Sequence, residues 1–190
     1  MRKFLSGIVF VALLVSMPAL AQAQRRTAAA SGGAKHEFGV DFGLAYYDPD
    51  GGEAGFKVGT PLDVRVGFVS AKKLQWEGRL ILDYDSKGAG TEAAYLIAPG
   101  VNVLYAMNRA TNRNGMFLTG GAGLNLVKFG ATSATGFSLN AAVGWRKPYG
   151  NAALRYEFGI KYDLEASDGA VVVIPKTLSI GARLGLSFWH

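Results

Sequence analysis

The sequence contains no cysteine, only six prolines among 190 residues, and few charged residues, which make up 18% of the chain. Without cysteine, neither a disulfide framework nor a thiolate metal site can form. Glycine and aromatic residues are abundant instead, with 26 glycines and 12% Phe, Trp and Tyr. This composition favours strands and turns over helices, which prefer Ala, Leu, Glu and Lys. The length suits one domain of ordinary size.

The first 23 residues have the pattern of a secretory signal peptide. Arg2 and Lys3 precede an apolar run from Ile8 to Val15. Pro18 follows, and then the small-residue motif Ala21-Gln22-Ala23, so Ala21 and Ala23 mark the predicted cleavage signal. The apolar run is short for a membrane-spanning helix, which makes a retained anchor the less favoured alternative.

Residues 24–35 are small and polar without periodicity, and we expect a flexible periplasmic leader there. The predicted signal holds two of the twenty basic residues and none of the fourteen acidic ones. The remaining excess of basic residues is small and dispersed, so the sequence does not predict nucleic-acid binding.

Residues 36–190 contain eight segments in which apolar residues alternate with small or polar ones. Such a period of two predicts strands. Pro99 lies inside the fourth segment, where a bulge or distorted pairing is expected because proline lacks the backbone donor. The connections are too short for parallel crossovers, although 108–115 is longer than its neighbours, so an antiparallel meander is predicted. The segments are 36–47, 62–70, 74–85, 95–105, 116–128, 137–146, 154–163 and 178–188.

The alternation fits two architectures that differ in which face is inside. A soluble ligand-binding barrel has its apolar face inside, whereas a membrane barrel presents it to lipid. The apolar face here carries no charge before the strand ends, where Lys128 is the nearest case. The opposite face combines glycine, alanine and serine with charges, and aromatic residues gather near strand ends, as in interfacial girdles. The membrane architecture is therefore favoured, and it must close because lipid cannot satisfy a sheet edge.

The chain from residue 36 onward resembles the small eight-stranded outer-membrane barrels of Gram-negative bacteria, of the OmpA transmembrane-domain and OmpX type. The resemblance rests on the signal peptide, the eight strands and the closing run "ARLGLSFWH". Arg183, Gly185, Phe188 and His190 align with the family's C-terminal assembly signal, which usually ends in Phe or Trp rather than His. The resemblance implies an all-β, eight-stranded, antiparallel, up-and-down transmembrane β-barrel in the cell outer membrane.

Charged residues on the inward face are the main candidates for function. They can form an ion path or gated pore, or a salt-bridged plug that closes the lumen. An eight-stranded barrel has a narrow interior and buried charges must be paired, so the plug is favoured. The predicted lumen network comprises Asp63, Arg65, Glu77, Arg79, Asp83, Arg155, Glu157, Lys161 and Arg183.

The sequence does not predict an enzyme. Only His36 and His190 could serve a hydrolase, and no serine or acid is spaced to complete a triad with them. No metal site or cofactor is expected. We expect a monomer with a structural or surface-interaction role, similar to adhesion, whose outward loops contact any surface ligand. A narrow channel is the alternative, and a soluble lipocalin-like binder is less favoured. Expected partners are outer-membrane lipid, lipopolysaccharide, the barrel assembly machinery and periplasmic chaperones.

Overall fold

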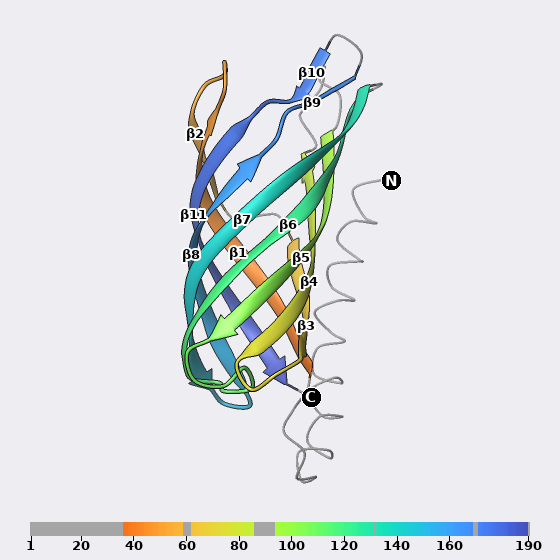
Figure 1. The fold of residues 1–190 in the computed structure, drawn as a ribbon. Helices are drawn as coiled ribbons and strands as arrows, with labels where there is room; N and C mark the ends of the chain where they lie inside the picture. The colour runs from red at the N-terminus through yellow and green to blue at the C-terminus, as the bar shows by residue number, and fades with distance from the viewer. Residues whose placement is uncertain (1–35, 59–61, 86–93, 131, 169–170, 190) are drawn as a thin grey trace, which may run out of the picture. The chain divides into compact units, whose positions relative to one another are not determined.

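The computed structural model describes residues 36–58, 62–85, 94–130, 132–168 and 171–189. The predicted signal peptide with Ala21 and Ala23, the predicted leader 24–35 and His190 lie outside these residues. Eight long strands form the wall of the barrel (Figure 1). They are β1 (His36–Pro49), β3 (Leu62–Val69), β4 (Leu74–Asp85), β5 (Ala94–Ala106), β6 (Gly115–Phe129), β7 (Thr132–Tyr149), β8 (Ala152–Asp163) and β11 (Thr177–Trp189).

The sheet closes on itself because its first and last strands pair. Each wall strand is antiparallel to the next, and β11 pairs with β1 from Glu37 opposite Trp189 to Pro49 opposite Thr177. Closure satisfies the backbone groups that would otherwise face the surroundings at two open edges. The predicted fold class, an eight-stranded antiparallel up-and-down barrel, is confirmed.

Three short strands lie within connections that the sequence analysis treated as loops. β2 (Gly55–Val58) pairs with β1, and β9 (Ala166–Asp168) pairs with β10 (Val171–Ile174) in a separate small sheet. β7 also begins five residues before the predicted Phe137, because Thr132 and the residues after it already pair with β6. The strand prediction was therefore correct for the wall and incomplete for its extensions.

The two ends of the barrel differ in their connections. We call one end the short-turn end, and its connections are residues 70–73, 107–114 and 150–151. The last of these turns is only two residues long, and its Gly150 has φ = 56°. Segment 107–114 folds back against the neighbouring turn, and the Ala110 backbone NH donates to the Lys72 carbonyl oxygen at 2.9 Å. The opposite end, which carries β2, β9 and β10, is called the long-loop end (Figure 1).

Pro99 interrupts the pairing of β5 with β6, as the sequence predicted. The ladder omits Ala98 and Pro99 and resumes at Gly100 opposite Gly123 in the same register. The distortion is thus a local gap in the pairing and not a bulge.

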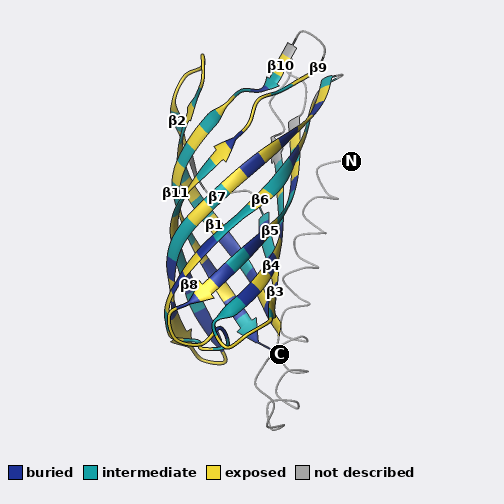
Figure 2. Ribbon diagram, in the orientation of Figure 1, coloured by how far each residue is buried: buried dark blue, intermediate teal, exposed yellow. Residues whose placement is uncertain are grey.

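Buried and exposed positions alternate along the strands (Figure 2). The buried positions are mostly polar, and large apolar side chains are exposed on the outside. Phe42 and Phe158 are more than half exposed on the outer face, whereas Glu37 and Arg65 are only 1% exposed inside. A soluble barrel that binds apolar ligands would have the opposite arrangement, so this observation disfavours the lipocalin-like alternative. Among the described residues, no helix is long and apolar enough to cross a membrane.

Candidate functional site

Charged side chains from five strands meet inside the half of the barrel near the short-turn end. Glu37 of β1 is at the centre of this cluster and is completely buried. Its carboxylate accepts hydrogen bonds from Arg65 Nη1 at 2.6 Å and from Arg146 Nη2 at 2.5 Å. Gln75 Nε2 donates to the same carboxylate at 2.7 Å. One carboxylate therefore joins strands β1, β3, β4 and β7.

Arg155 of β8 connects this centre to two further carboxylates. Its guanidinium donates to Glu77 through Nη1 at 2.8 Å and through Nη2 at 3.0 Å, a bidentate geometry. It also donates to Glu157. The side chains of Arg155 and Glu77 have no exposed surface. Such charges are tolerated only when paired and hydrogen-bonded.

The network continues toward the long-loop end through weaker contacts. Arg79 donates to Asp41 at 3.0 Å and to Glu157 at 3.1 Å. Arg183 approaches Glu157 at 3.5 Å and Asp63 at 3.6 Å, beyond the usual hydrogen-bond distance. The described network balances five acids, Glu37, Asp41, Asp63, Glu77 and Glu157, against five arginines, Arg65, Arg79, Arg146, Arg155 and Arg183.

An apolar floor lies next to the network at the short-turn end. Leu104 and Phe117 are buried there with Ala110 of the 107–114 turn. The Ala110 carbonyl oxygen accepts a hydrogen bond from Arg146 at 2.9 Å, and the Arg155 guanidinium lies 4.5 Å from the centre of the Phe117 ring. The long turn that the sequence could not explain therefore supplies part of this floor.

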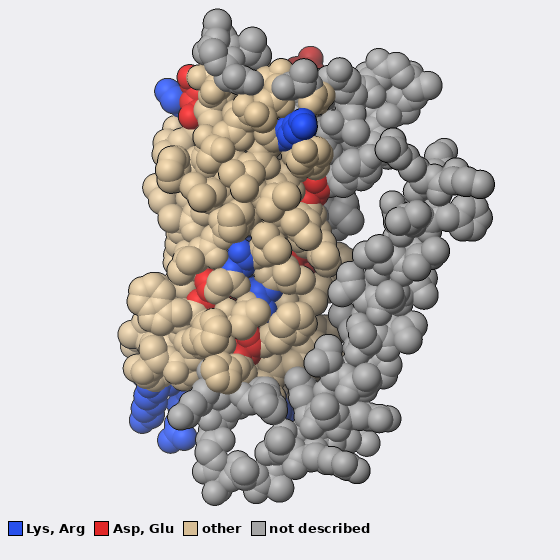
Figure 3. All heavy atoms as spheres, turned by 90° about the vertical axis from the view of Figure 1, so that its right-hand side faces the viewer, with Lys and Arg blue, Asp and Glu red and all other residues tan. Residues whose placement is uncertain are grey.

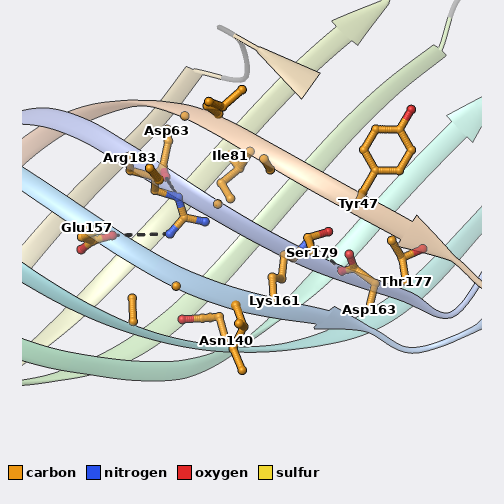
Figure 4. A pocket seen from close by; sticks show the side chains of 18 of the residues that line it. Tyr47, Asp63, Ile81, Asn140, Glu157, Lys161, Asp163, Thr177, Ser179 and Arg183 are labelled. Atoms are coloured by element: carbon orange, nitrogen blue, oxygen red, sulfur yellow. Dashed lines mark ion pairs between the residues drawn. The ribbon is translucent and has the colours of Figure 1, made fainter. Parts of the chain in front are cut away.

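A cavity of about 570 Å³ occupies the half of the lumen near the long-loop end (Figure 4). Arg183, Asp63 and Glu157 form its boundary with the network. Small residues line one wall at a common level, because Ala45, Gly181, Gly159 and Ala142 are successive register partners on four strands. The volume lies within the range of small-molecule sites, about 300–1,000 Å³.

A second polar cluster lies in the wall of this cavity. Lys161 Nζ is 2.7 Å from Asp163 Oδ1, and Asn125 donates to Asp163 at 2.6 Å. Both charged side chains line the cavity in Figure 4. In the described part of the chain, no hydrogen bond or ion pair joins this pair to the arginine network, so it is a separate cluster.

The predicted lumen residues thus fall into three groups. Seven of them, Asp63, Arg65, Glu77, Arg79, Arg155, Glu157 and Arg183, share the network. Lys161 belongs to the separate cluster, and Asp83 lines the cavity. Sequence reasoning left out Glu37, Asp41 and Arg146 from the network. All three lie on the inward alternation of their strands, which was the available signal.

The outer face is apolar between the two ends of the barrel. Figure 3 shows one side that is mostly uncharged, with charged side chains at both ends and a few charged atoms visible in its lower half. Trp76 and Trp145 are half-exposed, as expected for an interfacial girdle. Trp189, at the end of β11, is an exception to the girdle predicted from the aromatic residues near strand ends. It points inward and is buried, and its ring lies 5.2 Å from the Arg146 guanidinium.

The residues aligned with an assembly signal lie on β11. Gly185 is opposite Asp41 on β1, and the half-buried Phe188 is opposite Phe38. Arg183 faces the lumen at the edge of the cavity. His190 is outside the described residues.

The described residues contain no grouping suited to a metal ion. His36 lies at the start of β1, where its ring meets the Phe68 ring edge-on at 5.3 Å. No described contact joins His36 to a serine or a carboxylate.

No family model matches the sequence, and no curated protein matches it significantly. Solved structures do share its fold. Neisserial surface protein A, NspA, is 15% identical with a TM-score of 0.59, and the match covers 82% of this chain and 97% of that one. Ail, the attachment invasion locus protein of Yersinia pestis, solved with the heparin analogue sucrose octasulfate, is 12% identical with a TM-score of 0.50. That match covers 83% of this chain and all of Ail. Both are eight-stranded outer-membrane barrels, so the chain has the fold of that class.

Proposed function

We propose that this protein is an integral barrel of the Gram-negative outer membrane with a structural or surface-interaction role, and that its lumen is closed to ions and solutes. The fold and the apolar outer face support residence in a lipid bilayer, because only a closed barrel satisfies all strand backbones there. We orient the barrel with its long-loop end outward and its short-turn end toward the periplasm, because barrels of the outer membrane have short periplasmic turns and longer extracellular loops.

The observation that carries the closed lumen is the balanced network of five acids and five arginines. Its central members, Glu37, Glu77 and Arg155, have no exposed side-chain surface. An ion that crossed this layer would have to separate pairs that are hydrogen-bonded and out of water, at a cost of several kcal/mol per uncompensated charge. The apolar floor formed by Leu104 and Phe117 adds a second barrier.

A narrow channel for ions or small solutes remains the second candidate function, and one specific observation favours it. The lumen is already open as far as Arg183, whose two ion pairs are long and whose side chain is 27% exposed. A channel would require the layer below Arg183 to open as well.

The long-loop end is the proposed place for a surface ligand. Phe56 of β2 is 73% exposed and Val172 of β10 is 51% exposed. Ail was solved with a sulfated ligand, but acids accompany the lysines on the described loops here. Asp48, Asp50 and Glu53 are exposed at the tip of β1. A sulfated partner is therefore not favoured for this chain. Lys57, Lys87 and Lys176 also belong to this end by sequence, and the side chains of the first two are not described.

We propose no catalytic role, metal or cofactor for the protein. The strongest catalytic candidate, His36, packs against an aromatic ring, and a triad needs an oriented acid and a nucleophile beside it. The monomeric state of the barrel stays a prediction. So do its interaction with the barrel assembly machinery and periplasmic chaperones and the cleavage signal at Ala21 and Ala23.

Conductance in planar bilayers tests the closed lumen. We expect no stepwise openings from the wild-type barrel and frequent openings from Glu77→Ala, which leaves Arg155 without its bidentate partner. Lys147→Gln, at an exposed position on β7, is the matched control and should stay silent. Wild-type openings that Glu77→Ala abolishes would instead establish a channel.

Membrane residence is tested by fractionation and by heat-modifiable migration on gels. We expect the protein in the sarkosyl-insoluble fraction, with a folded form that migrates differently before and after boiling. Full recovery in a periplasmic wash would contradict the proposed location.

A further inference from the structure

One lysine, Lys128 of β6, interrupts the apolar outer face near the long-loop end. Its register partners are Tyr95 on β5 and Ser133 on β7, so the three residues form one row across three strands. All three are exposed. Within the part of the chain that the structure describes, no ion pair or hydrogen bond is recorded for the Lys128 ammonium group. The row therefore combines two hydroxyl-bearing side chains with a cation for which the described residues supply no ion pair.

The next rows toward the barrel middle are apolar except for Thr135. Ile97 of β5 and Leu126 of β6 are register partners, and Thr135 of β7 is opposite Leu126. Leu124 and the strongly exposed Phe137 form the row after that. A groove of about 360 Å³ connects the two levels. It is lined by Tyr95, Ile97, Leu126, Lys128, Thr135 and, from β9, Ser167, among others.

The position of Lys128 fixes the level of this groove relative to lipid. A lysine on the lipid-facing side of a barrel costs about 2–4 kcal/mol at the bilayer midplane but only about 0–1 kcal/mol near the interface. Tyr95 beside it is an amphipathic ring of the kind that prefers the headgroup level. The row of Lys128 thus belongs at the headgroups, and the groove over Ile97 and Leu126 extends toward the acyl chains.

We infer that this groove binds a phosphorylated glycolipid of the outer leaflet, lipopolysaccharide, with its phosphate on Lys128 and an acyl chain over Ile97 and Leu126. An ammonium group is complemented by an anion, and a phosphate supplies strong acceptor oxygens for Lys128 and for the neighbouring Tyr95 hydroxyl group. This inference rests on the proposed function, since that orientation places the long-loop end in the outer leaflet.

Native mass spectrometry of the full chain, purified from Gram-negative outer membranes and supplied with defined lipids, tests the site. Lipopolysaccharide should remain bound to the wild-type barrel. Lys128→Gln should reduce its apparent affinity about five-fold, as expected for one lysine at an anionic membrane surface. Lys147→Gln, which removes an exposed lysine of β7 at the short-turn end, is the matched control and should bind like wild type.

Two further lipids identify which chemistry is recognised. Dephosphorylated lipopolysaccharide should bind both the wild type and Lys128→Gln equally weakly, and phosphatidylglycerol should bind more weakly than the phosphorylated glycolipid. Leu126→Ala should weaken binding of the glycolipid without removing its dependence on phosphate. Equal binding by wild type and Lys128→Gln would overturn the inference, and so would equal binding of phosphatidylglycerol.

Gel migration before and after boiling, on the same samples, separates the two possible failures. A folded, membrane-derived barrel without lipid selectivity refutes the lipid site and leaves the proposed function standing. A chain that never enters the membrane fraction refutes the proposed function itself.

Discussion

The two halves of the lumen are built from the same kinds of strand but are packed differently. Near the short-turn end, Arg155 and Glu77 are completely buried and joined by bonds of 2.8–3.0 Å. Toward the long-loop end, Arg183 is 27% exposed, its ion pairs are 3.5 and 3.6 Å long, and a cavity of about 570 Å³ opens beside it. One half is filled to its centre, and the other has room for water or a ligand.

The difference comes from side-chain size on the inward alternation. The filled half contains arginines, glutamates, Gln75 and Phe117, whereas Ala45, Ala142, Gly159 and Gly181 face the cavity. Contacts inside the lumen therefore stabilise mainly the filled half, whereas the packing of the open half can change. Three sets of substitutions test that division, beginning with the largest expected effect.

Arg155→Ala should be the most damaging single change in the barrel. It leaves Glu77 and Glu157 buried without their closest partner, and breaking a buried ion pair typically costs about 3–5 kcal/mol. Arg183→Ala, the matched change in the open half, should cost about 1 kcal/mol or less, since its pairs are long and partly hydrated. Urea unfolding in lipid vesicles measures both free energies of unfolding. Equal losses would mean that the two halves are equally stabilised by their charges.

Gly39→Ala and Gly43→Ala form a matched pair on the same strand, β1. A methyl group at Gly39 would meet the guanidinium of Arg65, including Nη1 at 2.7 Å, and bonds to Glu37 and Asp41 hold that group in place. Overpacking of this kind costs about 1–3 kcal/mol.

At Gly43 the same methyl group would find Arg183 Cγ at 3.6 Å, an ordinary contact. We expect the free energy of unfolding to change by no more than about 0.5 kcal/mol there. Thermal and urea unfolding of the two variants should differ accordingly. A tolerated Gly39→Ala would show that the Arg65 contacts can rearrange and that the filled half is less rigid than its bonds indicate.

The smallest structural change is the introduction of a single cysteine, which can be labelled selectively because the sequence contains no other. Ser179→Cys introduces a single thiol into the wall of the cavity, and Ala153→Cys introduces one into the filled half, where Ala153 is completely buried. A water-soluble maleimide added to whole cells should label the first variant and spare the second until the barrel is unfolded. Labelling of both from outside would show that solvent passes the charge network.

The wall of the barrel was predictable because alternation depends only on neighbouring residues along one strand. The same local signal also predicts that Trp189 points inward. Leu184, Leu186 and Phe188 occupy the outward positions of β11, and Trp189 falls on the opposite alternation. The short strand β2 was missed because its four residues are set by pairing with β1, and not by a pattern of their own.

The network was only partly predictable, because the level of each charged side chain along the barrel axis depends on strand register and tilt. Glu37, Asp41 and Arg146 all carry the inward signal, but they lie on β1 and β7, far from Glu77 in sequence. Closure of the sheet brings Arg146 to within 2.5 Å of Glu37 from 109 residues away. Nothing in either segment alone reveals that distance.

The pairing of β1 with β11 has a consequence for the order of events during folding. Arg65 donates to Ser187 across 122 residues, and Arg155 reaches Glu37 across 118. Contacts so distant along the chain form late, because closing a long loop lowers the conformational entropy of the chain before the new bond provides any stabilisation. The charged layer is therefore complete only when the last strand docks on the first, so sealing the lumen and completing the barrel are one cooperative step.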